Sequence, residues 1–203
     1  MRLTLSVWLL CMLHIFISCK GYSQMLDSAA LQAQPVYDDL HKALQEPEKV
    51  YRLNLSKQKL NIFPEEIIQF KNLQELNLSK NRIDSLPEKI CTLTHLQILN
   101  VSGNKLKYLP DSIGSLKHLK KLQASRNNLL EIPTQIGELS NLEVLDLWEN
   151  DIGIFPDELG KLKKLRWMDL RVILIDDAMQ QRIQRLLPDV KIFFSPSCHC
   201  VTG

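Results

Sequence analysis

A 23-residue repeat constrains this chain more than any other feature of its sequence. Five full repeats run from Val50 to Lys164, and a sixth begins at Leu165. Neither one long helix nor one strand produces columns at this step, because their side-chain periods are about 3.6 and 2 residues. The repeat therefore predicts a solenoid in which each turn is one copy. The two clearest columns are Leu73, Leu96, Leu119, Leu142, Leu165 and Pro64, Pro87, Pro110, Pro133, Pro156.

Each repeat carries apolar residues at seven positions, numbered 1, 4, 6, 11, 14, 18 and 21. One strand or helix could not bury all seven, whereas stacked turns bury them against the same positions of their neighbours. Positions 4 and 6 alternate with polar residues, which predicts one short parallel strand per turn. In the third repeat the seven are Leu96, Leu99, Val101, Leu106, Leu109, Ile113 and Leu116.

Position 9 of the middle repeats is asparagine. At the tight inward turn expected there, a carboxamide can donate to and accept from backbone groups that a buried apolar residue would leave unpaired. We therefore expect a structural ladder and no ligand contact from these residues; it is broken at its ends by Gln58 and Ile173. The ladder consists of Asn81, Asn104, Asn127 and Asn150.

The fifth repeat, LEVLDLWENDIGIFPDELGKLKK, resembles the leucine-rich repeat pattern LxxLxLxxNxLxxLPxxIxxLxx almost position by position. The resemblance implies an α/β leucine-rich repeat solenoid with a short curved parallel sheet on its concave face and capping helices at both ends. The LPxxI form also resembles the intracellular repeats of Ras-suppressor and Scribble-like proteins. The segment HKALQEPEKVYRLNLS resembles the lead-in of short exported bacterial members of the family.

Residues 1–23 have the pattern of an export signal. Arg2 precedes an apolar run from Leu3 to Ile17, which is shorter than the roughly 20 residues that span a bilayer. We expect cleavage after Ser23 and a periplasmic or extracellular protein. The alternative is lipidation at Cys19, which would be the chain's only membrane contact, because Phe16-Ile17-Ser18-Cys19 resembles a bacterial lipoprotein box. If residues 1–23 are not a signal, the protein is a cytoplasmic signalling scaffold of the Ras-suppressor type.

Charge and motifs exclude several functions. Removing Arg2 and Lys20 lowers Lys+Arg from 25 to 23, equal to the 23 Asp+Glu, so the mature chain is neutral and nucleic acid is not an expected partner. The chain has no GxSxG, P-loop, GxGxxG or HExxH motif, which predicts neither enzymatic activity nor a cofactor. Cys198-His199-Cys200 could bind a soft metal, but it lacks the spaced pairs of a structural zinc site, so we expect an oxidisable tail and no metal.

The flanks of the repeats are expected to cap the solenoid. Val36, Leu40, Ala43 and Leu44 recur at helical spacing, and a second helix ends at Pro188 before a final strand. Caps at both ends predict a monomer. The expected division is an export signal (1–23), a flexible lead-in (24–35), an N-terminal cap helix (36–49), leucine-rich repeats (50–175), a C-terminal cap (176–195) and a flexible tail (196–203).

The concave face is the expected binding surface, because strand residues between the core leucines point outward. Its C-terminal half is aromatic and acidic, and exposed Trp is typical of interface hot spots. Trp167 could instead pack under the C-terminal cap. The acids predict a partner that brings Lys or Arg to that end. We therefore expect an exported protein-interaction module that binds a peptide or protein loop. The candidate partner-binding residues are Val144, Asp146, Trp148, Glu149, Trp167, Asp169 and Arg171.

Overall fold

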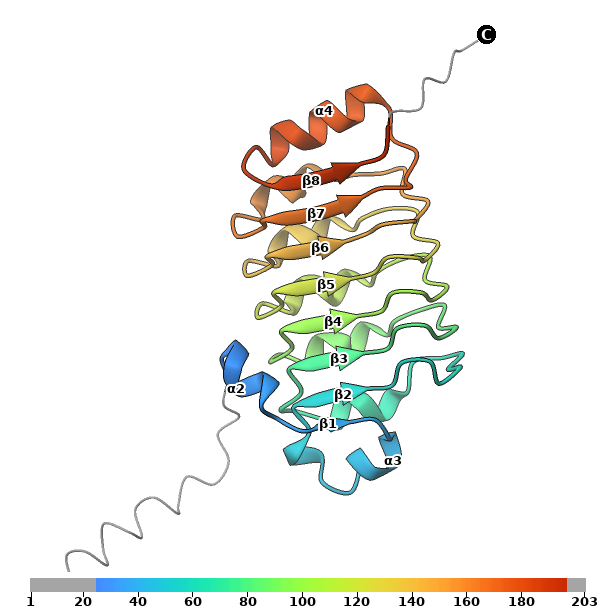
Figure 1. Ribbon diagram of the computed structural model, residues 1–203, viewed down its shortest axis with the longest axis vertical. Coiled ribbons are helices and arrows are strands. Elements are labelled where there is room, and N and C mark those ends of the chain that lie inside the picture. Colours follow the sequence, from blue (N-terminus) through green and yellow to red (C-terminus); the bar gives the residue numbers. More distant parts are fainter. Residues whose placement is uncertain (1–24, 197–203) are drawn as a thin grey trace, which may run out of the picture.

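The computed structural model describes residues 25–196, so the expected signal with Cys19 and the Cys198-His199-Cys200 cluster lie outside the described residues. Its main feature is one open sheet of eight parallel strands that follow one another in chain order (Figure 1). Such an order is what a solenoid of stacked turns produces. The strands are β1 (Val36–Tyr37), β2 (Arg52–Asn54), β3 (Glu75–Asn77), β4 (Ile98–Asn100), β5 (Lys121–Gln123), β6 (Val144–Asp146), β7 (Trp167–Leu170) and β8 (Lys191–Phe194).

The 23-residue step is the register of the sheet. Leu53, Leu76 and Leu99 lie opposite one another in β2, β3 and β4, and the same step continues to β7. The prediction of one short parallel strand per turn is confirmed. The last pair departs from the step, because Trp167 in β7 lies opposite Lys191 in β8, which is 24 residues further along the chain.

Short 3-10 helices return the chain on the side opposite the sheet (Figure 1). The proline column sets where five of them begin: each proline is the N-cap of the next helix, with φ between −65° and −76°. The pyrrolidine ring imposes this φ and thus prepares the chain for the turn. The helices are η1 (Pro47–Lys49), η2 (Glu65–Gln69), η3 (Glu88–Thr92), η4 (Asp111–Ser115), η5 (Thr134–Glu138) and η6 (Asp157–Lys161).

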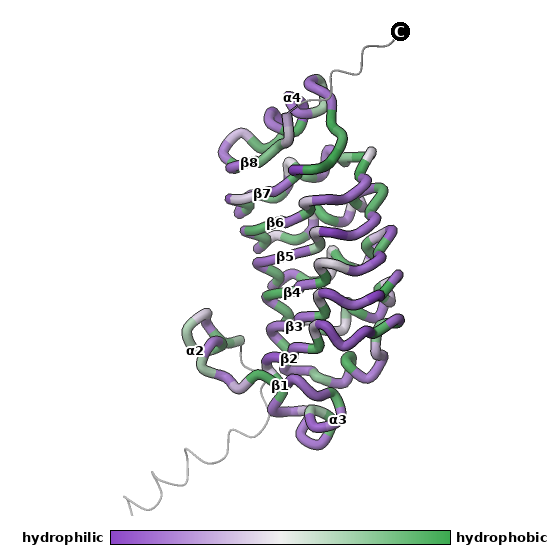
Figure 2. Tube along the Cα trace, turned by 45° about the vertical axis from the view of Figure 1, so that its right-hand side comes forward, coloured by the Kyte–Doolittle hydropathy of each residue, from purple (hydrophilic) through white to green (hydrophobic). Residues whose placement is uncertain are grey.

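The seven apolar columns form one core between the sheet and the 3-10 helices. In the third repeat all seven side chains are at most 4% exposed. Figure 2 shows the corresponding alternation of hydrophobic and hydrophilic residues along each coil. Leu60 in the first repeat is only half-buried, because no complete turn precedes it.

The position-9 asparagines connect neighbouring turns through their buried carboxamides. Asn104 Nδ2 donates to Leu78 O in the preceding turn (3.0 Å) and to Val101 O in its own turn (2.9 Å). Its Oδ1 accepts from the backbone N–H of Ile83 (3.0 Å). Every asparagine in the column therefore bonds at least three backbone groups in two turns. The same pattern recurs at Asn81, Asn127 and Asn150.

The N-terminal lead-in is not the loose segment expected from its sequence. It contains helix α2 (Ser28–Gln32), whose Leu31 is 2% exposed. The segment is held where the strands begin: Leu26 N–H donates to Gln74 Oε1 (3.0 Å), and Gln97 Nε2 donates to Leu26 O (2.8 Å). Glutamines at position 2 of two repeats supply these bonds. The composition of residues 24–35 alone could not predict them, because the partners lie in the repeats.

Residues 36–49 form three elements and not one cap helix. β1 pairs with β2, and α3 (Leu40–Ala43) and η1 follow it. The backbone edge of β2 explains the difference, because a strand at the end of a sheet leaves unpaired N–H and C=O groups that a further strand satisfies. Asp39 then starts α3 by accepting from Lys42 N–H (3.0 Å).

The C-terminal flank consists of helix α4 (Asp177–Leu186) followed by β8. Asp176 is the N-cap of α4, and its Oδ1 accepts from Met179 N–H (2.8 Å). Ile183 is fully buried, and Arg182 Nη2 lies 2.5 Å from Asp157 Oδ1 in η6. The helix thus closes the end of the core, as Figure 1 shows.

Candidate interaction surface

The sheet face consists of the side chains at positions 3, 5 and 7 of each repeat, which point away from the core. Position 5 is largely structural. Asn54, Asn77 and Asn100 each accept, through Oδ1, from the backbone N–H two residues later at 3.0–3.1 Å. Asp146 and Asp169 make the same bond, at 3.2 and 3.0 Å. The two candidate aspartates therefore shape the turn after each strand.

Trp148 lies half-buried on this face, with a charged neighbour on its ring. The guanidinium carbon of Arg126 is 4.3 Å from the centroid of the Trp148 ring, and Arg126 Nε donates to Glu149 Oε2 at 2.8 Å. A cation over an indole face is attracted by the ring's quadrupole. Arg126 is thus held between Trp148 and Glu149, and the charge of Glu149 is compensated.

Trp167 also lies on the sheet face, but it contacts the C-terminal cap. Its ring centroid is 5.6 Å from that of Phe193 in β8, with 51° between the planes. Asp169 is only 2% exposed and accepts from Arg171 Nη2 at 2.6 Å. The hydrogen bond and charge of Asp169 raise the pKa of Arg171.

Two of the three acids at the C-terminal end of the sheet face have a cationic partner within the face itself. Glu149 is paired with Arg126, and Asp169 is buried against Arg171. Asp146 is half-buried, and burial raises the pKa of its carboxyl, although hydrogen bonds from Trp148 N–H and Ser125 Oγ lower it. Glu149 and Asp169 already have cationic partners within the chain, and recruitment of basic groups of a binding partner by these acids stays a prediction.

A hollow of about 530 Å³ lies beside Trp148 on the sheet face. Ser125 Oγ donates at its floor to Ser102 Oγ or Asp146 Oδ2, both 3.1 Å away. Val144, Trp167 and Arg171 do not line it, so the hollow covers the middle of the sheet and only one of the predicted binding residues. Its lining is Ser79, Lys80, Asn81, Asn100, Ser102, Gly103, Gln123, Ser125, Arg126 and Trp148.

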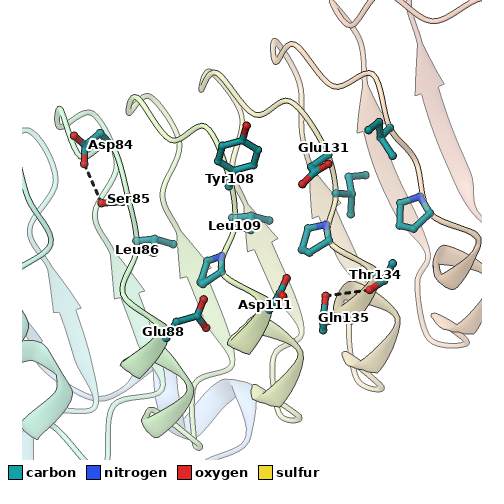
Figure 3. Close-up of a pocket in the computed structure, with 15 residues that line it drawn as sticks. Asp84, Ser85, Leu86, Glu88, Tyr108, Leu109, Asp111, Glu131, Thr134 and Gln135 are labelled. Carbon is teal, nitrogen blue, oxygen red and sulfur yellow. Dashed lines mark hydrogen bonds between the residues drawn. The ribbon is translucent and has the colours of Figure 1, made fainter.

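The flank groove is a second hollow, of about 560 Å³, on the segments that lead from the strands to the 3-10 helices (Figure 3). Tyr108 and Ile154 are 52% and 60% exposed at its rim. Some of its polar side chains hydrogen-bond to a sequence neighbour; Ser85 Oγ, for example, donates to Asp84 Oδ1 (3.0 Å). Its remaining carboxylates belong to Glu88, Asp111 and Glu131. Within residues 25–196 no three His, Cys, Asp or Glu side chains come together as a metal site.

Sequence reasoning missed three residues beside the candidate set. Arg126 could have been found from the repeat, because Glu149 follows it by one 23-residue step. Phe193 and Lys191 could have been found by continuing strand alternation into β8; Lys191 Nζ lies 5.0 Å from the Phe193 ring centroid. Elsewhere, His95 and His118 stack with 6.5 Å between their ring centroids, and His95 Nδ1 lies 3.0 Å from Lys71 O.

A family model described as a leucine-rich repeat region matches residues 48–191, more than half of the chain. The chain belongs to the leucine-rich repeat family. Proteins of this fold typically act as protein-interaction scaffolds and not as enzymes. None of the helices within residues 25–196 has the length and apolar character that a bilayer crossing requires.

Solved structures show the same fold in other leucine-rich repeat proteins. An internalin (inlF) from Listeria monocytogenes is 22% identical with a TM-score of 0.65, over 79% of this chain and 45% of that one. Internalin C2 (inlC2) from the same organism is 21% identical with a TM-score of 0.65, over 78% of this chain and 69% of that one. This chain thus spans less than half the length of the first internalin. The sequence matches no curated protein.

Proposed function

We propose that this leucine-rich repeat protein is an exported, non-enzymatic interaction module that binds a peptide or protein loop on its sheet face. The observation that carries the proposal is Trp148, a half-buried indole that lines a hollow on the sheet face and lies outside the core. A large aromatic side chain held in one orientation loses little conformational freedom on binding and offers much area, which is why Trp dominates interface hot spots.

The size of the sheet face limits the partner. Strands β2 to β7, spaced about 4.8 Å apart and about 17 Å high, give an area on the order of 400 Å². A standard protein interface buries roughly 800 Å² on each partner. An extended peptide or a single loop fits the smaller area, whereas a globular partner would have to reach the flanks as well.

Trp148→Ala tests the site. A random peptide library displayed on phage is selected for binding to the wild-type protein, and the tightest-binding peptide is titrated against the wild type and its variants. Trp148→Ala should weaken its binding by about 2 kcal/mol, roughly 30-fold, while the unfolding midpoint stays near wild type. Tyr108→Ala, on the flank groove, is the matched control. A peptide that loses affinity with Tyr108→Ala and keeps it with Trp148→Ala would place the binding site in the flank groove.

Export is supported by the pattern of residues 1–23. Mass spectrometry of the protein isolated from its own host should find a chain that begins at Gln24 or at a lipid-modified Cys19. An intact chain beginning at Met1 would refute export and favour the cytoplasmic scaffold.

A further inference from the structure

The turn edge is the row of side chains at positions 8 and 10 of each repeat, directly after the strands. In the first four repeats it carries six cations and no acid, and Figure 2 shows strongly hydrophilic residues along the turns after β2 and β3. Among the described residues only Arg126 of these six forms an ion pair. The charge turns acidic in the fifth repeat at Glu149 and Asp151. The six cations are Lys57, Lys59, Lys80, Arg82, Lys105 and Arg126, all exposed.

Position 8 has a left-handed backbone in every repeat, with φ between 55° and 68°. Five of its six residues nevertheless carry side chains, among them Lys80 and Arg126 on either side of Gly103. A Cβ on Gly103 would meet Lys80 Cα at 3.5 Å and Lys80 Cγ at 3.6 Å, which are ordinary contacts, so the Lys80 side chain directly borders this position. Neither the backbone nor the available space therefore requires glycine here. Because Gly103 has no side chain, it leaves a gap in the turn edge between the two cations Lys80 and Arg126.

This gap opens into the hollow beside Trp148, because Lys80, Gly103 and Arg126 all line it. The cations stand two turns apart, about 10 Å between their Cα atoms, wide enough for one extended polypeptide. Trp148 forms the far wall and holds Arg126 at 4.3 Å from its ring. The Ser102 hydroxyl and the Gln123 carboxamide are partly exposed and supply donors and acceptors that an extended backbone needs. Ser125 is buried, and its hydroxyl already bonds within the face.

We infer that the partner's docking segment is an acidic extended peptide that crosses the turn edge at Gly103, between Lys80 and Arg126, and packs an apolar side chain against Trp148. The inference rests on the proposed function and names its partner's chemistry. Charge complementarity selects carboxylates mainly through Lys80, which forms no ion pair among the described residues, whereas Arg126 is already paired with Glu149. The aromatic wall selects a polypeptide with apolar side chains over a plain polyanion, which would gain nothing from Trp148.

The test selects peptides on the wild-type protein and titrates the tightest of them against wild type and Gly103→Arg. The arginine side chain fills the gap and also adds a cation to the turn edge. Its backbone is compatible with position 8, because Arg126 has a positive φ at the same position of the next repeat. Wild type should enrich peptides that combine Asp or Glu with an apolar residue. Gly103→Arg should weaken the best of them by at least about tenfold, comparable to a hot-spot loss. Lys80→Gln should weaken it about two- to fivefold, the range of an exposed ion pair. Lys89→Gln, an exposed cation on the 3-10 helix side, is the matched control and should change nothing.

Three outcomes would overturn the inference. Acidic peptides that bind Gly103→Arg more tightly than wild type would show a general basic edge without a gap site. Peptides that depend on Trp148 but lack acids and tolerate Gly103→Arg would leave the proposed function standing and remove this one. Selection of no peptide that depends on Trp148 would remove both. Circular dichroism and the unfolding midpoint of Gly103→Arg confirm that any loss is not a loss of fold.

Discussion

Replacing Asn104 with Ala removes one rung of the asparagine ladder, and the structure gives its cost. Two of the three bonded groups keep a second donor: Leu78 O still accepts from Asn81 Nδ2 (2.8 Å), and Val101 O from Asn127 Nδ2 (3.1 Å). Each of these two lost bonds costs about 1 kcal/mol. The N–H of Ile83 loses its acceptor in a buried site, which costs about 1–3 kcal/mol more. The free energy of unfolding should fall by about 3–5 kcal/mol in total.

Urea denaturation followed by circular dichroism measures this loss. The matched control is Asn128→Ala, an exposed asparagine in the adjoining turn that should change the free energy of unfolding by no more than about 0.5 kcal/mol. Asn150→Ala should cost more than Asn104→Ala. It deprives Leu129 N–H of its acceptor and also Leu147 O of its amide donor, since Ile173 stands at position 9 of the next turn. A loss below about 1 kcal/mol for Asn104→Ala, or equal losses at both positions, would refute the ladder's role.

Leu99→Ala deletes a fully buried side chain between two neighbouring turns and should lower the free energy of unfolding by about 2–5 kcal/mol in the same assay; an unchanged midpoint would mean that the register is wrong. Asp146→Asn should stabilise the protein at pH 7 by on the order of 0.5 kcal/mol, since Asn54, Asn77 and Asn100 make the same turn bond without a charge. The folded state raises the pKa of the Asp146 carboxyl, so the wild-type protein binds that proton more tightly when folded and loses stability as pH rises through the folded pKa. The stability advantage of Asp146→Asn should therefore shrink at acidic pH. An advantage that grew at acidic pH would contradict the assignment.

The core and the sheet could be predicted from sequence because they depend on one periodic pattern. Leu76 must lie beside Leu99 once each turn is one repeat, and Asn104 must face the backbone of two turns. The N-terminal flank could not be predicted in this way. Val36 and Tyr37 fit a helix or a strand by spacing alone, and the unpaired edge of β2, which only the folded sheet creates, decides for the strand.

The candidate site, too, could be predicted only in part. Trp148 could be placed on the sheet face because position 7 alternates with the core leucines. The availability of the acids could not be predicted, because it depends on side chains that fold back: Arg171 reaches Asp169 two residues earlier in its own turn. The role proposed for Gly103 could not be predicted either, because position 8 varies from repeat to repeat. It depends on Lys80, Gly103 and Arg126 lining the same hollow.

The most direct test of the sheet-face account is nuclear magnetic resonance of the isotope-labelled protein titrated with the selected peptide. Binding on the sheet face predicts the largest amide shifts at Ser102, Gly103 and Ser125, together with a shift of the Trp148 indole N–H. Largest shifts at Tyr108 and Ile154, with those four signals unchanged, would contradict the account and assign binding to the flank groove.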